Sequence, residues 1–168
     1  MWRTPSDKSA YATQMKKRSP ALCGWSINNF HIYRRIIPVE ALTQAVLCLA
    51  MNVYFEARSE DMLGQLAVAE VTLNRVESER YPDNICDVVW QRKQFSWTHD
   101  GKSDVPRDKV AWERALYVAR TAIETEDMAV VGDGVTHYHA EYVKPYWTTS
   151  YTRVAKVGSH IFYKRGQT

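Results

Sequence analysis

The sequence predicts an α+β fold: a predominantly helical domain that ends in a small C-terminal β-sheet. Up to about residue 125, apolar residues recur at the spacing of amphipathic helices. Further on, residues 135–142 and 155–163 form short runs rich in aromatic and β-branched residues, as strands do. Helices that precede strands rather than alternate with them are typical of α+β domains. The 168 residues suffice for one domain with its own core.

Four helices are expected ahead of the strands. Pro38 suits the first turn of a helix over residues 38–58, because its missing N–H would have no partner there. A second helix over 62–77 ends before a cluster of turn residues, and a short helix over 85–91 follows. The helix over 107–125 is the most clearly amphipathic of the four. The inward-facing residues predicted for the first helix are Leu42, Val46, Leu49, Val53 and either Tyr54 or Phe55.

Residues 1–37 are expected to form a basic arm ahead of a single domain over residues 38–168. Residues 1–40 carry seven Lys or Arg against two acidic residues, a local charge of +5, so the remainder of the chain is near −2. A basic arm suits contact with an anionic surface such as nucleic acid, anionic lipid or a cell-wall polymer. A disordered solubilising tail is the alternative interpretation.

The run over residues 52–60 is the most informative stretch of the chain. It places the carboxylates of Glu56 and Glu60 one helical turn apart at the end of an apolar helix. Apolar neighbours withdraw water from an acid, which raises its pKa and lets it keep a proton near neutral pH, as a general acid must. A solvated helix end is the alternative. For Glu60, capping a turn or pairing with Arg58 or Arg75 is favoured over a direct catalytic role.

Several short motifs follow one another in a fixed order over about residues 42–164. They are Tyr54-Phe55-Glu56-Ala57-Arg58, Gly64-Gln65-Leu66-Ala67-Val68-Ala69, Leu73-Asn74-Arg75-Val76, Tyr81-Pro82, Cys86-Asp87-Val88-Val89, Gln94-Phe95-Ser96-Trp97, Thr136-His137-Tyr138-His139-Ala140 and Gly158-Ser159-His160-Ile161-Phe162-Tyr163. Together they resemble the pattern of the SleB-type cell wall hydrolases, a family of spore-cortex-lytic enzymes and their phage and bacterial relatives. Phe55 and Ser59 depart from that pattern, which has Gly at these positions.

The resemblance implies a lysozyme-like, lytic-transglycosylase-like core and an enzyme that cleaves peptidoglycan between N-acetylmuramic acid and N-acetylglucosamine. Such cleavage needs a proton donor for the leaving oxygen. In a lytic transglycosylase the C6 hydroxyl of N-acetylmuramic acid attacks its own anomeric carbon, so one carboxyl group serves as acid and then as base, without cofactor or metal. Glu56 is the matching position. If water is the acceptor instead, Glu60 and Asp100 are the candidates for a second carboxylate.

The predicted substrate-binding residues are aromatic rings, which stack on sugars, and polar side chains, which bind hydroxyl and acetamido groups. They are Tyr54, Asn74, Gln94, Phe95, Trp97, His137, His139 and Trp147. For Phe95 and Trp97, an equally open interpretation is that they anchor the loop over residues 96–106 in the core. Asn74 and Arg75 could orient Glu56 by hydrogen bonding, or they could form a buried structural bridge.

Two other functions are considered. His137 and His139 share one face of a predicted strand, and His160 lies in another, so the three could ligate the zinc ion of an N-acetylmuramoyl-L-alanine amidase. No H-E-x-x-H motif accompanies them, and alternating His and Tyr could line a sugar groove without metal, so we expect no metal and no cofactor. The other possibility is a non-catalytic module that binds cell wall or nucleic acid through its basic arm.

The three cysteines, Cys23, Cys48 and Cys86, form no C-x-x-C pair and predict neither a disulfide framework nor a zinc site. Cys48 and Cys86 are interpreted as small buried residues, which favours synthesis in a reducing compartment. No signal peptide or transmembrane segment is predicted, so we expect synthesis in the cytoplasm, release of the phage-lysin kind and action on the cell wall. Peptidoglycan is the expected partner, specific nucleic-acid binding is not expected, and a monomer is expected by analogy.

Overall fold

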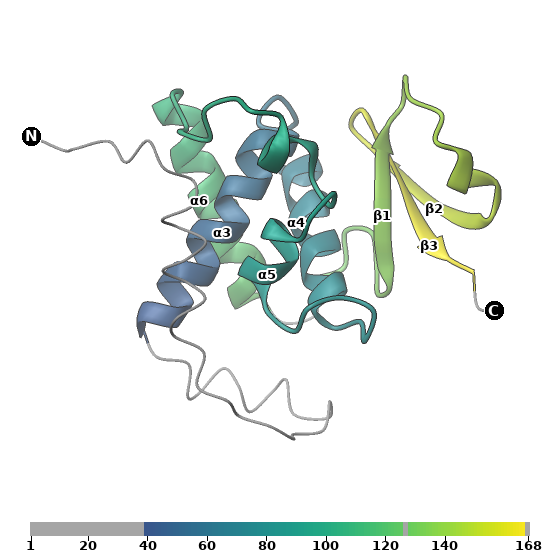
Figure 1. Ribbon diagram of the computed structural model, residues 1–168, viewed down its shortest axis with the longest axis horizontal. Helices are drawn as coiled ribbons and strands as arrows, with labels where there is room; N and C mark the ends of the chain where they lie inside the picture. The colour runs from purple at the N-terminus through teal and green to yellow at the C-terminus, as the bar shows by residue number, and fades with distance from the viewer. Residues whose placement is uncertain (1–38, 126–127, 167–168) are drawn as a thin grey trace, which may run out of the picture. The chain divides into compact units, whose positions relative to one another are not determined.

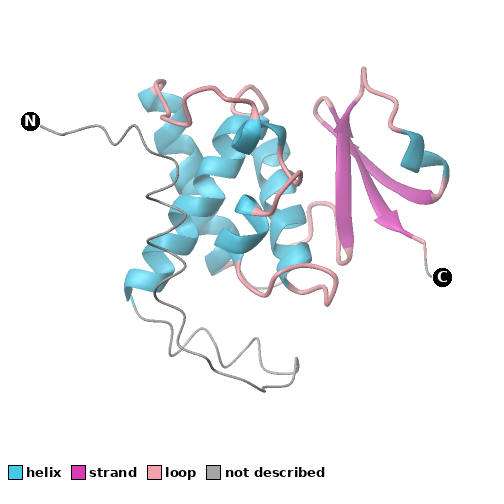
Figure 2. Cartoon of the chain, in the orientation of Figure 1, coloured by secondary structure: helices cyan, strands magenta, loops and turns pink. Residues whose placement is uncertain are grey.

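The computed structural model describes residues 39–125 and 128–166, so the predicted arm lies outside the described residues. The described α-helices precede the strands, as Figures 1 and 2 show. The α-helices are α3 (Val39–Ala57), α4 (Met62–Val76), α5 (Ile85–Trp90) and α6 (Lys109–Glu124), with 3₁₀ helices η2 (Ser96–His99) and η3 (Tyr146–Thr149); the strands are β1 (Val135–Ala140), β2 (Tyr151–Val157) and β3 (His160–Arg165). This confirms the predicted α+β class.

The helical core forms between α3, α4 and α6. From α3, Val46, Leu49 and Val53 are buried in it, in line with the predicted inward face. The facing side of α6 is rich in small side chains, which let the two helices approach closely; its buried members are Ala111, Ala115, Val118, Ala119 and Ala122. Helix ends are capped by side chains: Asp61 accepts a hydrogen bond from the Gly64 N–H and Asp108 from the Ala111 N–H.

The strands form one antiparallel sheet with the order β1-β3-β2. The run over 155–163, predicted as a single strand, in fact contains the end of β2, a turn at Gly158 and Ser159, and the start of β3. Residues typical of strands lie on both sides of the turn, so composition alone does not reveal the reversal. One face of the sheet packs on α4, with the fully buried Phe162 and Val135 among its contacts.

Buried polar groups on α4 fix the start of β1. The carboxylate of Glu70 accepts hydrogen bonds from the N–H groups of Val130, Val131 and Gly132 at 2.8–2.9 Å. One turn further along the helix, Asn74 Nδ2 donates to two carbonyl oxygens of the same segment. Because buried charges and amides are costly without partners, these bonds hold β1 in one position against α4.

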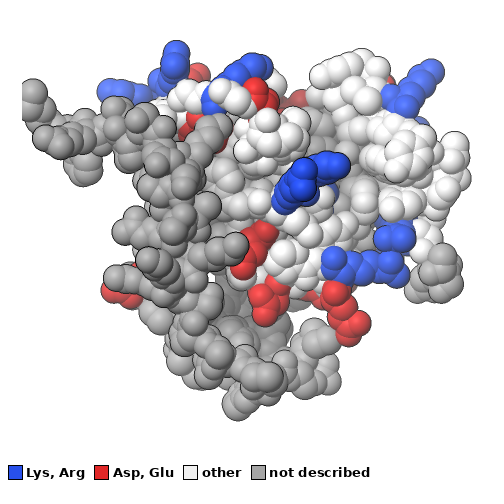
Figure 3. Space-filling model, viewed as in Figure 1, with Lys and Arg blue, Asp and Glu red and all other residues white. Residues whose placement is uncertain are grey.

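Charged side chains on the face drawn in Figure 3 are of mixed sign. Among the described residues on this face, Lys and Arg lie interspersed with Asp and Glu instead of gathering in one large basic area. A surface of mixed charge gives little long-range attraction for a polyanion.

Among the described residues, no helix combines the length and the apolar character that crossing a membrane requires.

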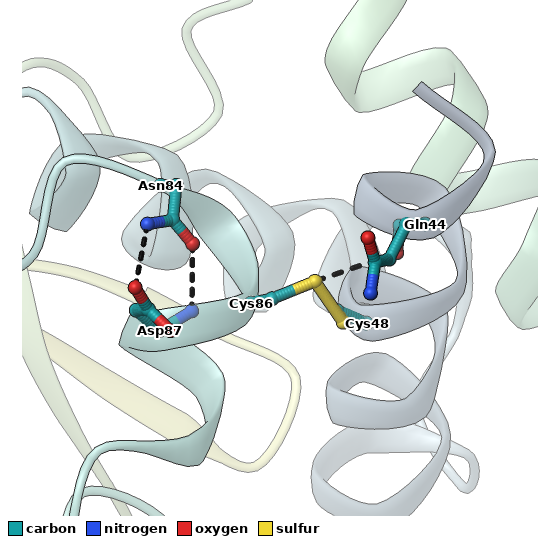
Figure 4. Close-up of a disulfide and its surroundings, with 5 residues drawn as sticks. All are labelled: Gln44, Cys48, Asn84, Cys86 and Asp87. Carbon is teal, nitrogen blue, oxygen red and sulfur yellow. Dashed lines mark hydrogen bonds between the residues drawn. A yellow bond between two sulfur atoms is a disulfide. The ribbon is translucent and has the colours of Figure 1, made fainter. Parts of the chain in front are cut away.

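A disulfide bond joins Cys48 on α3 to Cys86 on α5, with Cα atoms 5.3 Å apart (Figure 4). The interpretation of the two cysteines as small residues outside any disulfide was therefore wrong, although Cys48 is buried as predicted. The two residues are 38 positions apart, and nothing in the local sequence of either indicates that α5 lies against α3. Cys23, the remaining cysteine, lies outside the described residues. The bond ties the helix that carries Glu56 to the short helix that leads into the Gln94 segment.

Candidate active site

A pocket of about 220 Å³ lies between the end of α3, the end of α4, the segment after α5 and the middle of β1. Its lining residues are Glu56, Arg75, Gln94, Phe95, Ser96 and Tyr138. Glu56 is the single carboxylate among these lining residues. Four of the motifs that are far apart in the sequence therefore contribute to one pocket, and that pocket contains one acid.

Glu56 sits in the last turn of α3 and is half-buried. The hydroxyl of Tyr138 donates a hydrogen bond to its Oε2 atom at 3.1 Å. Burial raises the pKa of Glu56, and the Tyr138 hydrogen bond and the positive charge of Arg75 offset part of that rise. The acid thus keeps its proton to a higher pH than an ordinary glutamate, which is the property that a proton donor needs.

Tyr138 is a pocket residue that the sequence analysis did not select. The alternation of β1 puts it on the opposite face from His137 and His139, and the sequence alone does not reveal that this face meets the acid. Its ring packs near Phe162 and edge-on to His160. Burial raises the pKa of Tyr138 well above 10, so the hydroxyl stays protonated and donates a hydrogen bond to Glu56.

Arg75 forms another wall of the pocket. Its Nε donates to the carbonyl oxygen of Thr136 at 2.8 Å, and its guanidinium lies over the rings of Phe95 and Tyr81. Burial lowers the pKa of Arg75, while Tyr138, Tyr81 and Glu56 counteract that effect. Among the described residues, Arg75 forms no hydrogen bond to Glu56, so it acts on the acid through charge and not through the predicted hydrogen bond.

The segment after α5 contributes Gln94 and Phe95 to the pocket, and their contact with substrate stays a prediction. Trp97 does not line the pocket. It is 6% exposed, its Nε1 donates to Asn52 Oδ1 at 3.3 Å, and its ring stacks on Phe55. The alternative interpretation, an anchor for the following loop, therefore describes Trp97 better than substrate contact.

The backbone of the same segment is strained next to the site. Lys93, the residue before Gln94, has φ 66°, a left-handed conformation that costs a non-glycine residue about 1–2 kcal/mol. Surrounding contacts must compensate for this cost, and such strained positions are frequent where a side chain has to be held in a particular direction. Here the strained residue directly precedes the pocket amide.

Tyr54 and Asn74 do not line the pocket either, so their predicted contact with substrate needs correction. The buried Tyr54 hydroxyl accepts hydrogen bonds from the N–H groups of Arg107 and Asp108, both at 3.1 Å, and so fixes the start of α6. The Nδ2 of Asn74 donates to the carbonyl oxygens of Gly132 and Val135. Asn74 is thus the structural bridge that was its alternative interpretation.

His137, His139 and Trp147 form a separate aromatic cluster on the face of the sheet that points away from α4. The ring of Trp147 lies 5.3 Å from that of His137 and 5.7 Å from that of His139, and Tyr151 and Tyr163 complete the cluster. Burial, with the charges of Arg75 and Arg165, lowers the pKa of His137 to about 4. None of the three predicted residues lines the Glu56 pocket.

The three histidines do not converge on one point. His160 lies on the opposite face of the sheet from His137 and His139, buried beside Glu60 and Tyr138. Over residues 39–125 and 128–166, no group of three His, Cys, Asp or Glu side chains is placed to hold a metal ion. The arrangement therefore does not support the zinc site considered for an amidase.

Glu60 is not a second carboxylate of the pocket. It accepts hydrogen bonds from the N–H of Ser159, at 3.1 Å, and from the Ser159 hydroxyl, and its Oε1 lies 3.6 Å from His160 Nδ1. The residue lies beyond the end of α3 and ties the β2–β3 turn to it, so neither predicted pairing, with Arg58 or Arg75, is present. Asp100 lies in an exposed loop and pairs with Lys102.

Gly158→Ala is expected to destabilise the fold by about 2–4 kcal/mol, measured by urea unfolding. Gly158 has φ +55°, and an added methyl group would overlap the Glu60 Oε2 atom that accepts from Ser159. Gly101→Ala is the matched control, because Gly101 has φ +78° with nothing within 4 Å, and it should cost only about 1–2 kcal/mol of backbone strain. Equal losses for the two variants would contradict a clamp between Glu60 and the turn.

Tyr138→Phe is expected to raise the pKa of Glu56 and to reduce the rate of cleavage about tenfold, since hydrogen bonds to charged groups contribute about 1.5–3 kcal/mol. The lost hydrogen bond stabilises the carboxylate, so its removal favours the protonated form. Activity that needs the acid form should then persist to higher pH, and the alkaline limb of the pH–rate profile should move up. Tyr163→Phe, which alters the outer cluster, should leave that limb in place; a downward shift for Tyr138→Phe would refute the assignment.

The fold and the pocket define a lysozyme-like domain built around one carboxylic acid. Comparison with known proteins agrees with this description. The family profile described as Cell Wall Hydrolase matches residues 59–163, a match that begins three residues after Glu56. The chain belongs to the cell wall hydrolase family, which confirms the resemblance found in the motifs.

Solved structures of the same kind are similar over most of the chain. The catalytic domain of the germination-specific lytic transglycosylase SleB from Bacillus anthracis matches with a TM-score of 0.58 and 26% identity, over 76% of this chain and 100% of that one. The catalytic domain of the Bacillus cereus SleB protein gives a TM-score of 0.53 and 27% identity, over 72% of this chain and 91% of that one.

Relatives in sequence are longer proteins. The spore cortex-lytic enzyme of Bacillus cereus is 31% identical over 116 residues, which are 69% of this chain and 42% of that enzyme. The spore cortex-lytic enzyme of Halalkalibacterium halodurans is 29% identical over 126 residues, 75% of this chain and 36% of that enzyme. The match thus spans 36–42% of the length of these enzymes.

Proposed function

We propose that this protein degrades peptidoglycan as a lytic transglycosylase, cleaving the β-1,4 bond between N-acetylmuramic acid and N-acetylglucosamine with Glu56 as acid and then base. One observation carries the proposal: the pocket contains a single carboxyl group, half-buried and with a raised pKa. Family membership and likeness to the SleB catalytic domains support the choice of substrate.

The reaction can proceed on one carboxyl group. Protonated Glu56 gives its proton to the glycosidic oxygen as the C1–O4 bond breaks, and N-acetylglucosamine leaves with a free hydroxyl. The C6 hydroxyl of N-acetylmuramic acid then bonds to its own C1 and returns its proton to the Glu56 carboxylate, which restores the acid and forms the 1,6-anhydro product. Tyr138 occupies Oε2, so Oε1 is the atom that exchanges the proton.

Arg75 and Tyr138 stabilise Glu56 in its deprotonated form, which exists midway through the reaction. Both lower the pKa of Glu56, so each stabilises the carboxylate that exists between the two proton transfers. Burial acts in the opposite direction and keeps the resting acid protonated. The balance between these effects lets one residue lose and regain a proton within a single turnover.

A two-carboxylate hydrolysis is less well supported by the geometry. It needs a second carboxyl group about 5–5.5 Å from the acid for retention, or about 6.5–9.5 Å for inversion. Glu60 contacts Ser159 and His160 instead, and Asp100 lies in an exposed loop with Lys102.

The volume of the Glu56 pocket, about 220 Å³, is below the roughly 300 Å³ of small binding pockets, so the pocket suits one sugar ring of a longer strand.

The disulfide supports the proposal that the protein acts outside the reducing cytoplasm. Disulfides form and persist outside the reducing cytoplasm, so the bond between Cys48 and Cys86 suits a protein that acts at the cell wall. Synthesis in the cytoplasm would then be followed by oxidation after release. Contact of the basic arm with an anionic surface and a monomeric state are further parts of this proposal.

The deciding experiment is mass spectrometry of purified peptidoglycan after digestion, with and without EDTA. Anhydro-muropeptides that form equally in EDTA are expected. Muropeptides with a reducing end would show hydrolysis and require a second carboxylate or a water held by another group. Free stem peptides that disappear with EDTA would establish an amidase and refute the glycosidase proposal. Intact peptidoglycan that binds the protein would favour a non-catalytic module.

A further inference from the structure

Arg75 places a buried positive charge directly in the wall of the Glu56 pocket. The residue is 5% exposed and lines the pocket beside the acid. Its Nε donates to the Thr136 carbonyl oxygen, and its guanidinium lies over the rings of Phe95 and Tyr81. Among the described residues, its buried Nη1 atom has no hydrogen-bond partner. The cation is therefore fixed in place while part of its hydrogen-bonding capacity is unused.

The groups that face Arg75 do not cancel this charge when the enzyme is ready to react. Glu56 must be protonated, and hence neutral, to act as an acid. Tyr138, with a pKa well above 10, is neutral. Tyr81 presents its aromatic ring and its hydroxyl group to the guanidinium. His137, with a pKa of about 4, is uncharged at neutral pH. The lining residues of the reactive pocket thus carry a net charge of one positive unit.

We infer that the pocket selects N-acetylated sugars and rejects de-N-acetylated ones, because Arg75 repels the ammonium group that removal of the acetyl group creates. This inference rests on the proposed function, since it takes a peptidoglycan sugar as the occupant. A pocket of about 220 Å³ is only roughly 7 Å across if it is compact, well inside the screening distance of salt, so an ammonium group anywhere in it feels the guanidinium. A neutral acetamido group is tolerated, and its carbonyl oxygen can accept from a guanidinium N–H.

The test compares three preparations of one peptidoglycan: native N-acetylated material, the same material after chemical de-N-acetylation, and a portion that is then re-acetylated. The readout is the ratio of kcat/KM on N-acetylated to de-N-acetylated substrate. At pH 6.5 the wild type should prefer the acetylated substrate about tenfold or more, as expected for like charges within several ångströms at a partly buried site. Re-acetylation should restore the rate, which excludes damage to the glycan.

Three arginine variants test whether Arg75 causes the preference for N-acetylated substrate. Arg75→Gln should reduce the preference about tenfold, whereas Arg75→Lys should keep most of it because the charge remains. Arg58→Gln is the matched control, because Arg58 is an exposed residue next to the same helix end that does not line the pocket. It should leave the preference unchanged. A preference that survives Arg75→Gln in folded protein would overturn the inference.

A pH series on the wild type keeps the test decisive if Arg75→Gln does not fold. The ammonium group of an amino sugar resembles an α-amino group and loses its proton at about pH 8. The preference should therefore shrink between about pH 6 and pH 9, since the ionisation of Glu56 affects both substrates equally and cancels in the ratio. A preference that is constant with pH would point to steric recognition and refute the inference. Failure to cleave any of the three substrates would instead refute the proposed function.

Discussion

Glu56→Gln is expected to lower the rate of peptidoglycan cleavage about 10³-fold, the size of effect that a lost general acid or base typically produces. The amide has nearly the same shape as the carboxylic acid, and its oxygen can still accept the hydrogen bond that Tyr138 donates. It cannot release a proton to the leaving oxygen, and it cannot take one back from the C6 hydroxyl. The measurement is the initial rate of anhydro-muropeptide release by purified protein, with folding checked by circular dichroism.

Two carboxylate variants serve as controls for this loss. Asp100→Asn changes an exposed loop residue and should retain the wild-type rate. Glu60→Gln weakens the tie to Ser159 and His160, so it should lower stability while the rate per folded molecule stays within about tenfold of the wild type. If Glu56→Gln remained active and one of these two variants did not, the single-acid mechanism would be wrong.

Reduction of the Cys48–Cys86 disulfide is expected to lower the free energy of unfolding by about 2–5 kcal/mol, and Tm by about 10 °C. The bond closes a segment of 38 residues, and cross-linking removes entropy from the unfolded chain more than from the folded one. That segment contains the end of α3, all of α4 and the start of α5, so it includes both Glu56 and Arg75. Its loss should therefore loosen the framework of the pocket.

The measurement is thermal and urea unfolding of the oxidised and reduced protein in a Cys23→Ser background, so that only one cysteine pair remains. Cys48→Ser with Cys86→Ser should match the reduced protein, which separates the loss of the bond from effects of the reductant. A reduced protein as stable as the oxidised one would show that the disulfide adds nothing to folding. Free thiols at both positions after air oxidation would contradict the bond itself.

Local patterns in the sequence were enough to predict most of the secondary structure. The helix predicted over 38–58 spans Val39–Ala57, and that over 107–125 spans Lys109–Glu124. In both helices the buried face repeats with the period of the helix, so the spacing of apolar residues in the sequence reveals the helix. The order of the motifs also predicted the family, because it is a property of the chain that folding does not change. Glu56 was proposed from its apolar surroundings within one helix.

Only the tertiary structure decided which residues share the pocket with Glu56. Strand alternation divides Tyr138 from His137 and His139, but a strand pattern does not say which face meets the helices. Packing against α4 settled this in favour of Tyr138, and it left the histidines and Trp147 on the other face. Glu60 likewise does not share the pocket with Glu56, because it accepts a hydrogen bond from Ser159, a residue 99 positions away.

The same distinction holds for the disulfide and the hairpin. Cys48 and Cys86 meet because α5 lies on α3, and the chain reverses at Gly158 within a run whose residue types favour strand on both sides. The sequence by itself therefore determined the helices and the family, because each depends on residues close together in the chain or on their order, and it was enough to propose Glu56 as the acid. The partners of that acid, the disulfide and the sheet face depend on contacts between distant segments, and only the folded chain brings those segments together.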